Sequence, residues 1–151
     1  MRRVQFILHD PSKCSGCMLC TIICSLKHFH KVSLELSAIR IKRLEEDWIR
    51  GDSEELFRAV ICDQCAEVDP TPCISACPIG ALKRDPRTGV VKIDSTACTS
   101  CRACELSCGK RALFYGKEEL SMIKCDLCDG DPSCVKVCPD GALSLEEVAR
   151  N

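Results

Sequence analysis

Cysteine is the residue whose number and spacing could do chemistry in this chain, since 16 of the 151 residues are cysteines. They fall into four groups of four. Groups one and three have the spacing C-x2-C-x2-C-x3-C, and groups two and four widen the middle gap to seven and five residues. The groups are Cys14, Cys17, Cys20 and Cys24; Cys62, Cys65, Cys73 and Cys77; Cys98, Cys101, Cys104 and Cys108; and Cys125, Cys128, Cys134 and Cys138. No Ser–His–Asp set, phosphate loop or dinucleotide fingerprint accompanies them.

Disulfides, zinc sites and iron–sulfur clusters all use this much cysteine. Disulfides need an oxidising compartment. The apolar run near the N-terminus covers only residues 4–8, which is too short for a signal peptide. No stretch approaches the roughly 18 apolar residues of a membrane helix. The sequence therefore predicts a cytoplasmic protein with no membrane span, whose cysteines bind metal.

The spacing favours iron–sulfur clusters over zinc. Zinc takes pairs of C-x2-C, so groups two and four alone fit it, but the third cysteine of groups one and three has no role there. Three cysteines at steps of three can wrap three corners of a cubane, and the small residues Ser15 and Gly16 let the backbone come close. In the bacterial run the fourth cysteine ligates the neighbouring cluster. We therefore predict four 4Fe–4S clusters, with a zinc-binding structural or regulatory protein as the alternative of another class.

Sharing cysteines between clusters predicts electron transfer rather than substrate chemistry. In a helix, Cys20 and Cys24 are about one turn apart, so their Cα atoms are separated by about 6 Å. If each ligates a different cluster, the two cluster centres lie on the order of a dozen ångström apart. The same arrangement occurs in all four groups. The chain is therefore expected to conduct electrons and to have no catalytic activity of its own.

The charges are balanced, with 21 Lys and Arg against 22 Asp and Glu, and no basic run predicts nucleic-acid binding. Thiolates and oxidised cluster cores would take the formal charge to roughly −9. Basic residues among the ligands could moderate this charge; they are Lys13, Arg102, Lys110, Arg111, Lys124 and Lys136. His9, His28 and His30 are not needed as ligands, because the cysteines already divide into complete sets. We expect the histidines on the surface or beside a cluster.

A repeat follows three of the groups. The segments CPIGAL, CGKRAL and CPDGAL start at Cys77, Cys108 and Cys138, which indicates duplicated units of strand, cysteine loop, short helix and strand. Each helix is expected from the third to the fourth cysteine, ending at Cys77 and Cys138 because proline follows. The expected strands are 4–8, 39–44, 56–61, 82–83, 90–93, 113–115 and 143–145. Residues 146–150 are expected to add a final helical turn.

The four groups in this order, with the widened second and fourth and the CPxGAL tails, resemble the four-cluster ferredoxin-type electron-transfer subunits of molybdenum and tungsten oxidoreductases and certain hydrogenases. The resemblance covers nearly the whole chain. Two stretches, CSLKHFHKVSLELSAIRIKR (24–43) and KCDLCDGDPSCVKVCPDGAL (124–143), look like the small subunits of tungsten-type aldehyde oxidoreductase complexes and related acyl-CoA-reducing enzymes.

In that family the first group pairs with the fourth and the second with the third. The resemblance thus implies four ligand sets: cluster 1 with Cys14, Cys17, Cys20 and Cys138; cluster 2 with Cys62, Cys65, Cys73 and Cys108; cluster 3 with Cys98, Cys101, Cys104 and Cys77; and cluster 4 with Cys125, Cys128, Cys134 and Cys24. Cys24 and Cys108 depart from the pattern, since Ser25 and Gly109 replace the proline. The ends of those two helices are therefore left open.

The implied fold is α+β, with two interleaved bacterial dicluster-ferredoxin-like modules of short strands and helices around the clusters. The outer module would comprise residues 1–38 plus 117–151, and the inner module residues 57–116. Residues 39–56 would be an insertion, either a hairpin or a contact with a partner.

The expected function is electron conduction between a large catalytic subunit, of the tungsten or molybdenum pterin type, and an external electron carrier or flavin subunit, in anaerobic metabolism. A free-standing polyferredoxin that shuttles by diffusion is the alternative.

Overall fold

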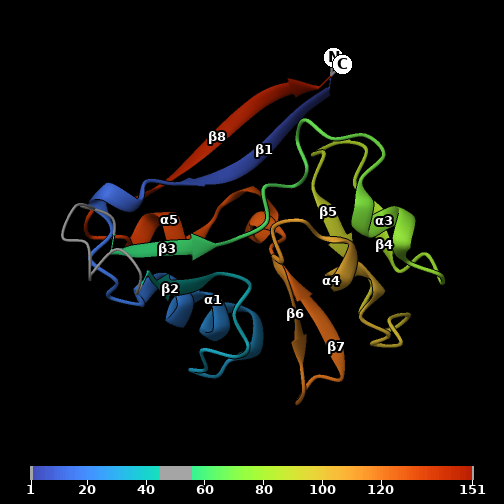
Figure 1. Ribbon diagram of the computed structural model, residues 1–151, viewed down its shortest axis with the longest axis horizontal. Coiled ribbons are helices and arrows are strands. Elements are labelled where there is room, and N and C mark those ends of the chain that lie inside the picture. The colour runs from blue at the N-terminus through green and yellow to red at the C-terminus, as the bar shows by residue number, and fades with distance from the viewer. Residues whose placement is uncertain (1, 45–55, 151) are drawn as a thin grey trace.

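The computed structural model describes residues 2–44 and 56–150, which form a small mixed fold of short helices and strands (Figure 1). The elements in chain order are β1 (Arg2–His9), the 3-10 helix η1 (Pro11–Lys13), α1 (Leu19–Phe29), β2 (Arg40–Arg43), β3 (Phe57–Val60), α3 (Pro72–Ala76), β4 (Leu82–Arg84), β5 (Val91–Ile93), α4 (Ala103–Ser107), β6 (Leu113–Gly116), β7 (Ser121–Lys124), the 3-10 helix η2 (Leu127–Gly130), α5 (Ser133–Val137) and β8 (Leu143–Arg150).

The strands form four separate two-stranded antiparallel sheets in the described residues. The pairs β4–β5 and β6–β7 are hairpins, and β2–β3 flanks the segment 45–55, which lies outside the described residues. The pair β1–β8 joins the two ends of the chain, which meet at the top of Figure 1. No sheet is wide enough to form a core by itself, so the helices and cysteine loops must supply the rest.

The short helices pack in two pairs that ignore sequence order. Helix α1 packs against α5, and α3 packs against α4. Figure 1 shows the first pair beside β2 and β3, and the second pair beside β4 and β5, with the β6–β7 hairpin between them. The predicted module boundary at residues 116 and 117 falls in the turn of that hairpin.

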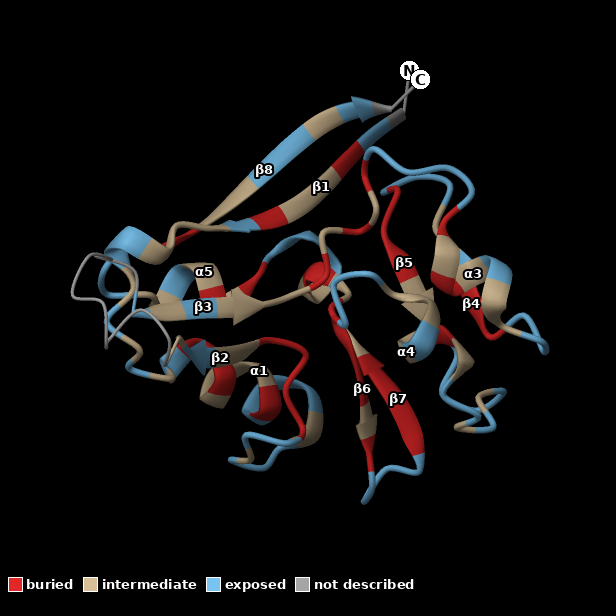
Figure 2. Cartoon of the chain, in the orientation of Figure 1, coloured by how far each residue is buried: buried red, intermediate tan, exposed pale blue. Residues whose placement is uncertain are grey.

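The buried side chains form two apolar clusters, both of which contain cysteines. The larger includes Ile39 and Leu127 together with Cys20, and the smaller includes Val91 and Leu113. Figure 2 shows that the buried stretches are short and are separated by intermediate and exposed ones. A core this thin gains stability from any ligand that binds only the folded state.

Two local features differ from the sequence-based expectations, and a third at Gly16 adds to them. Residues 146–150 form no helical turn: they continue β8, because β1 offers an antiparallel partner over its whole length, with Val4 opposite Val148. The strand β7 was not expected, although Met122 and Ile123 in it are buried. At Gly16, a Cβ would meet the Phe57 ring at 2.6 Å, so this glycine makes room for an aromatic side chain.

Candidate metal centres

Each cysteine group is built as a tight loop that runs into a helix. The third cysteine is the second residue of its helix in all four groups, and these four cysteines are buried: Cys20, Cys73, Cys104 and Cys134. The loops before them curl through left-handed backbone, with Met18 and Arg102 at positive φ directly before α1 and α4. This curl turns successive sulfurs inward, as the spacing in steps of three predicts.

The sulfurs gather in hollows that combine cysteines from distant groups. One hollow is lined by Cys14, Cys17, Cys20 and Cys138. A second is lined by Cys125, Cys128, Cys134 and Cys24. A third is lined by Cys77, Cys98, Cys101 and Cys104. In each hollow, three sulfurs come from one group and the fourth comes from the helix that packs alongside.

The remaining thiols also lie near one another. Burial, together with the charges of Asp63, Cys62, Cys73 and Cys108, raises the pKa of Cys65 to about 11. The structure therefore brings Cys62, Cys65, Cys73 and Cys108 close enough for mutual electrostatic repulsion.

The donor sets fit a cationic cluster core. Burial is the main cause that raises the pKa of Cys73 to about 11, and burial together with the charges of neighbouring thiols raises that of Cys134 to about 12. Converging thiolates in such a place would repel one another and lack solvation. A cation that binds all four relieves both costs and displaces the protons. Four soft sulfur donors per site, without oxygen ligands, suit iron–sulfur clusters or zinc.

The repeated tail after the fourth cysteine has a definite role. The backbone N–H of the alanine four residues on donates to the cysteine Sγ in each repeat: Ala81 to Cys77 at 3.3 Å, Ala112 to Cys108 at 3.5 Å, and Ala142 to Cys138 at 3.3 Å. Such bonds stabilise a thiolate and tune the potential of a cluster. The repeated alanine was visible in the sequence, but its function as a donor was not deduced from it.

Helices end at the fourth cysteine where a proline follows it, and in one group where no proline follows. Cys77 and Cys138 end their helices in extended geometry, as predicted. Cys108 ends α4 in the same way, although Gly109 follows it. Cys24 differs, since α1 runs through it to Phe29, and its Sγ accepts an N–H from Ala38 at 3.4 Å.

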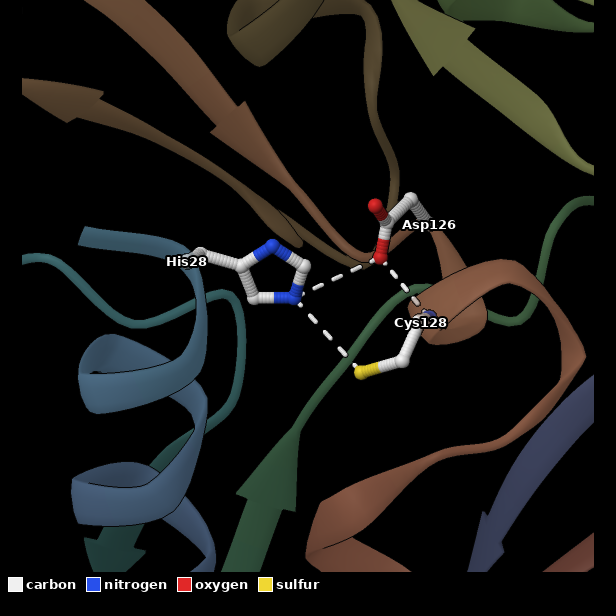
Figure 3. A group of neighbouring side chains, drawn as sticks. All are labelled: His28, Asp126 and Cys128. Atoms are coloured by element: carbon white, nitrogen blue, oxygen red, sulfur yellow. Dashed lines mark hydrogen bonds and ion pairs between the residues drawn. The ribbon is translucent and has the colours of Figure 1, made fainter. Parts of the chain in front are cut away.

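Helix α1 carries a histidine to the same region (Figure 3). His28 Nε2 lies 3.5 Å from Cys128 Sγ and 3.5 Å from Asp126 Oδ1, and the N–H of Cys128 donates to Asp126 at 2.8 Å. Burial tends to raise the pKa of Cys128, but the His28 hydrogen bond and a backbone N–H lower it overall. Because Cys128 also lines the hollow with Cys24, this trio extends that site rather than forming a separate one.

The other two histidines differ from His28 in their surroundings. His9 lines the hollow that contains Cys14, and its Nδ1 accepts the N–H of Ala59 at 3.3 Å. His30 follows α1 as an exposed residue. All three histidines thus lie on the surface or beside a cysteine site, as expected.

Exposure separates the four sets into two kinds. Cys17 and Cys101 are exposed, so their two sets reach the surface. The sets that contain Cys62 and Cys125 have no exposed cysteine. Two sets are therefore interior and two are peripheral.

Comparison with known proteins gives the family. Residues 55–148 match the 4Fe–4S dicluster domain. The chain belongs to this family. The matched residues include groups two, three and four, whereas the first group precedes them.

Relatives with known roles cover nearly the whole chain. The polyferredoxin-like subunit of aliphatic sulfonate oxidoreductase from Pyrococcus furiosus is 37% identical over 97% of this chain and 79% of its own length. Subunit beta of the NADH-dependent phenylglyoxylate dehydrogenase from Aromatoleum evansii is 36% identical over 94% of this chain, which spans only 30% of that protein. In a solved structure of the active-site complex BamBC of benzoyl coenzyme A reductase with zinc, a 28% identical chain matches all of this chain and 83% of its own, with a TM-score of 0.56.

The chain is accordingly an iron–sulfur electron-transfer protein and not a catalyst on its own. Among the described residues, no helix has the length and apolar character needed to cross a membrane.

Proposed function

We propose that the chain holds four 4Fe–4S clusters in the sets named above and conducts electrons as a subunit of an oxidoreductase complex. The observation that carries this proposal is the crossed packing of α1 on α5 and of α3 on α4. Each of these helices offers its third cysteine to one proposed set and its fourth to another. Bound clusters would supply one-electron redox chemistry, and the protein would set their spacing and surroundings.

Electrostatic contacts between sets support a linear order. The charge of Cys20 in cluster 1 raises the pKa of Cys134 in cluster 4. The charge of Cys62 in cluster 2 raises the pKa of Cys125 in cluster 4. Likewise, the charge of Cys104 in cluster 3 raises the pKa of Cys73 in cluster 2. The proposed order is therefore cluster 1, cluster 4, cluster 2, cluster 3.

The two ends of this order are the peripheral sets. Cys17 belongs to cluster 1 and Cys101 to cluster 3, and both cysteines are exposed. Electrons would enter at one end and leave at the other, where a partner can approach. In this scheme clusters 1 and 4 form the outer ferredoxin-like module and clusters 2 and 3 the inner one.

For the partner we propose a large catalytic subunit of the tungsten or molybdenum pterin type, with an external electron carrier or flavin subunit at the other end. Support comes from the resemblance of residues 24–43 and 124–143, and from similarity to subunits of an aliphatic sulfonate oxidoreductase and of a benzoyl coenzyme A reductase complex. We also propose a cytoplasmic location, because cluster ligands must stay reduced and disulfides are rare there.

Metal analysis of anaerobically purified full-length protein tests the cluster content. Roughly sixteen iron and sixteen acid-labile sulfide per chain are expected for four clusters. Four zinc ions without sulfide would instead establish the zinc-binding alternative. Co-purification of a large redox subunit supports the complex, whereas a monomer that never recovers one supports the diffusing polyferredoxin.

Exchange of a fourth cysteine tests the crossed ligand sets. Cys138→Ser should damage the cluster held by Cys14, Cys17 and Cys20, as shown by the reduced electron paramagnetic resonance spectrum. Cys134→Ser, four residues earlier on the same helix, is the matched control and should damage cluster 4. If both variants lose the same cluster, the crossed scheme is wrong.

A further inference from the structure

Lys124 occupies a distinctive position between the two interior sites. It is the last residue of β7 and directly precedes Cys125. Its ammonium donates to Gln64 Oε1 at 2.8 Å, to the Val91 carbonyl at 2.8 Å and to the Cys125 carbonyl at 2.9 Å. An ammonium has three N–H donors, so these acceptors use all of them. All of the acceptors are uncharged.

Its main partner, Gln64, is itself immobilised. Gln64 lies between Cys62 and Cys65, and its side chain is fully buried at 0% exposure. Its Nε2 donates to the Cys125 carbonyl at 2.9 Å, and its Oε1 also accepts the N–H of Val91 at 3.0 Å. The loop of group two, β5 and the start of group four thus meet at Lys124 and fix its charge in place.

The other basic residues near the ligands are mostly neutralised. Lys13 pairs with Asp10, Arg102 with Glu105, Lys110 with Asp63, and Lys136 with Asp131. All four of these cationic side chains are more than half exposed, so solvent screens their charges as well.

The charge of Lys124 reaches both interior sets. Burial raises the pKa of Cys73, a member of the cluster 2 set, and the positive charge of Lys124 opposes that rise. Burial also raises the pKa of Cys125, a member of the cluster 4 set, and Lys124 again acts in the opposite direction. The ammonium is held against the Cys125 carbonyl and against the side chain of Gln64, which lies between Cys62 and Cys65. A positive charge beside both sets favours any negative charge added there.

We infer that Lys124 raises the reduction potentials of clusters 2 and 4 relative to clusters 1 and 3. Reduction adds one negative charge to a cluster, and a fixed positive charge beside it in a half-buried position stabilises the reduced form. This inference rests on the ligand sets proposed above. It gives Lys124 an electrostatic role: it keeps the potentials of the two middle clusters high enough for each to accept an electron from the cluster at its end of the order.

The test compares redox titrations of three variants with the wild type, all as anaerobically purified full-length protein. Lys124→Met removes the charge and keeps an unbranched side chain. Lys124→Arg keeps the charge. Lys117→Met removes the same charge from the exposed turn between β6 and β7 and is the matched control. Signals that disappear in Cys17→Ser and Cys101→Ser identify the two peripheral clusters.

At a potential held at the wild-type midpoints, Lys124→Met should raise the oxidised-to-reduced ratio of the two interior clusters by about tenfold, which corresponds to 59 mV for a one-electron couple. The peripheral clusters should change much less. Lys124→Arg and Lys117→Met should leave all midpoints near their wild-type values.

Three results would overturn the inference: unchanged interior midpoints in Lys124→Met, an equal shift in all four clusters, or the same shift in the Met and Arg variants. If Lys124→Met fails to hold four clusters, Lys124→Gln replaces it. Failure of both neutral variants would make Lys124 a structural residue and would also overturn the inference. If the wild type itself holds no iron–sulfur clusters, the proposed function fails, which is a separate result.

Discussion

The surroundings of Cys24 and those of the other three fourth cysteines meet the same chemical need by different routes. Cys77, Cys108 and Cys138 each end a short helix and take an N–H from an alanine four residues on. Cys24 lies inside a helix of 11 residues, so the next N–H groups along the chain serve that helix. Its donor is Ala38, 14 residues further on. A backbone N–H on the sulfur is thus retained while the chain path that delivers it changes.

Buried serines hold the longer path in place. Ser25, at 0% exposure, donates to the Ile22 carbonyl at 3.0 Å and accepts the N–H of Ser33 at 3.1 Å. Ser37, also at 0%, donates to the Ile39 carbonyl at 2.7 Å. In the three repeats a single turn brings the backbone N–H to the sulfur, whereas at Cys24 a longer loop, held by serine hydrogen bonds, does so.

The longer helix also adds a contact that the three repeats lack. One turn beyond Cys24, His28 reaches Cys128, which belongs to the same proposed set. When Cys128 is a thiolate, His28 Nε2 must carry the proton of this hydrogen bond. The comparison therefore joins two differences, in the N–H donor and in the side chain beside the sulfur.

Removal of the clusters should have the largest effect on this comparison. We expect the apoprotein, prepared by oxidation and chelation, to lose cooperative unfolding, because the core is thin and the sites hold it together. During partial removal, hydrogen exchange should rise first at residues 30–39 and later at 109–112 and 139–142, since local turns persist longer. An apoprotein that unfolds cooperatively at an unchanged temperature would contradict this expectation.

Ser25→Ala should be the next largest perturbation. The variant leaves the N–H of Ser33 without its acceptor next to a buried position, so we expect the free energy of unfolding to fall by about 1–2 kcal/mol. Denaturant unfolding under argon, with iron content measured in parallel, provides the test.

Ser107→Ala is the matched control for Ser25→Ala, because its hydroxyl bonds only to the Cys104 carbonyl within its own helix. The loss there should be smaller, about 0.5 kcal/mol. If the free energy of unfolding falls equally in the two serine variants, the hydrogen bond between Ser25 and Ser33 does not stabilise the loop.

His28→Leu should change one cluster only. Loss of the hydrogen bond to Cys128 should favour the oxidised form of cluster 4 by about 1 kcal/mol, and potentiometric titration would show this as a lower midpoint. His30→Leu is the control, because His30 is an exposed residue beyond the helix. If the midpoint potential shifts equally in both variants, or if cluster 2 shifts as well, the effect does not come from the His28–Cys128 hydrogen bond.

Arg111→Gly should have the smallest effect, and it sharpens the comparison among the repeats themselves. Gly80 and Gly141 occupy the third position after the cysteine with φ of +65° and +61°, whereas Arg111 has φ of 50° at the same place. Left-handed backbone costs a residue with a side chain more than glycine. We expect Arg111→Gly to raise the free energy of unfolding by about 0.5–1 kcal/mol, and Gly141→Ala to lower it by about 0.5–1 kcal/mol. Thermal unfolding of the two variants measures both signs.

Several parts of the molecule could be predicted from short-range spacing. The C-x2-C-x2-C-x3-C runs indicated metal and the helix after each loop, and Pro78 and Pro139 marked helix ends at Cys77 and Cys138. These features depend on residues within one or two turns of one another. Backbone geometry fixes such relations almost regardless of the rest of the fold.

The other features depended on partners far away in the chain. Residues 146–150 became a strand because β1 was available to pair with them. Ala38 reached Cys24 because buried serines closed a loop, and nothing in the sequence marks that alanine. Lys124 was one of six similar basic residues in the sequence, and only its placement against Gln64 and Val91 distinguishes it.

The sequence by itself thus determined the donor atoms and their local loops, because ligand spacing is a property of a few consecutive residues. The tertiary structure decided which sulfurs share a hollow, which N–H reaches Cys24 and which acceptors hold Lys124. Those choices follow from contacts between separated segments: 14 residues for Ala38 and Cys24, 60 for Lys124 and Gln64, and more than a hundred for α1 and α5. Spacing along the chain carries no record of which segments pack together. The ligand sets were therefore implied only by the family resemblance, and the N–H donor of Cys24 and the acceptors of Lys124 only by the folded arrangement.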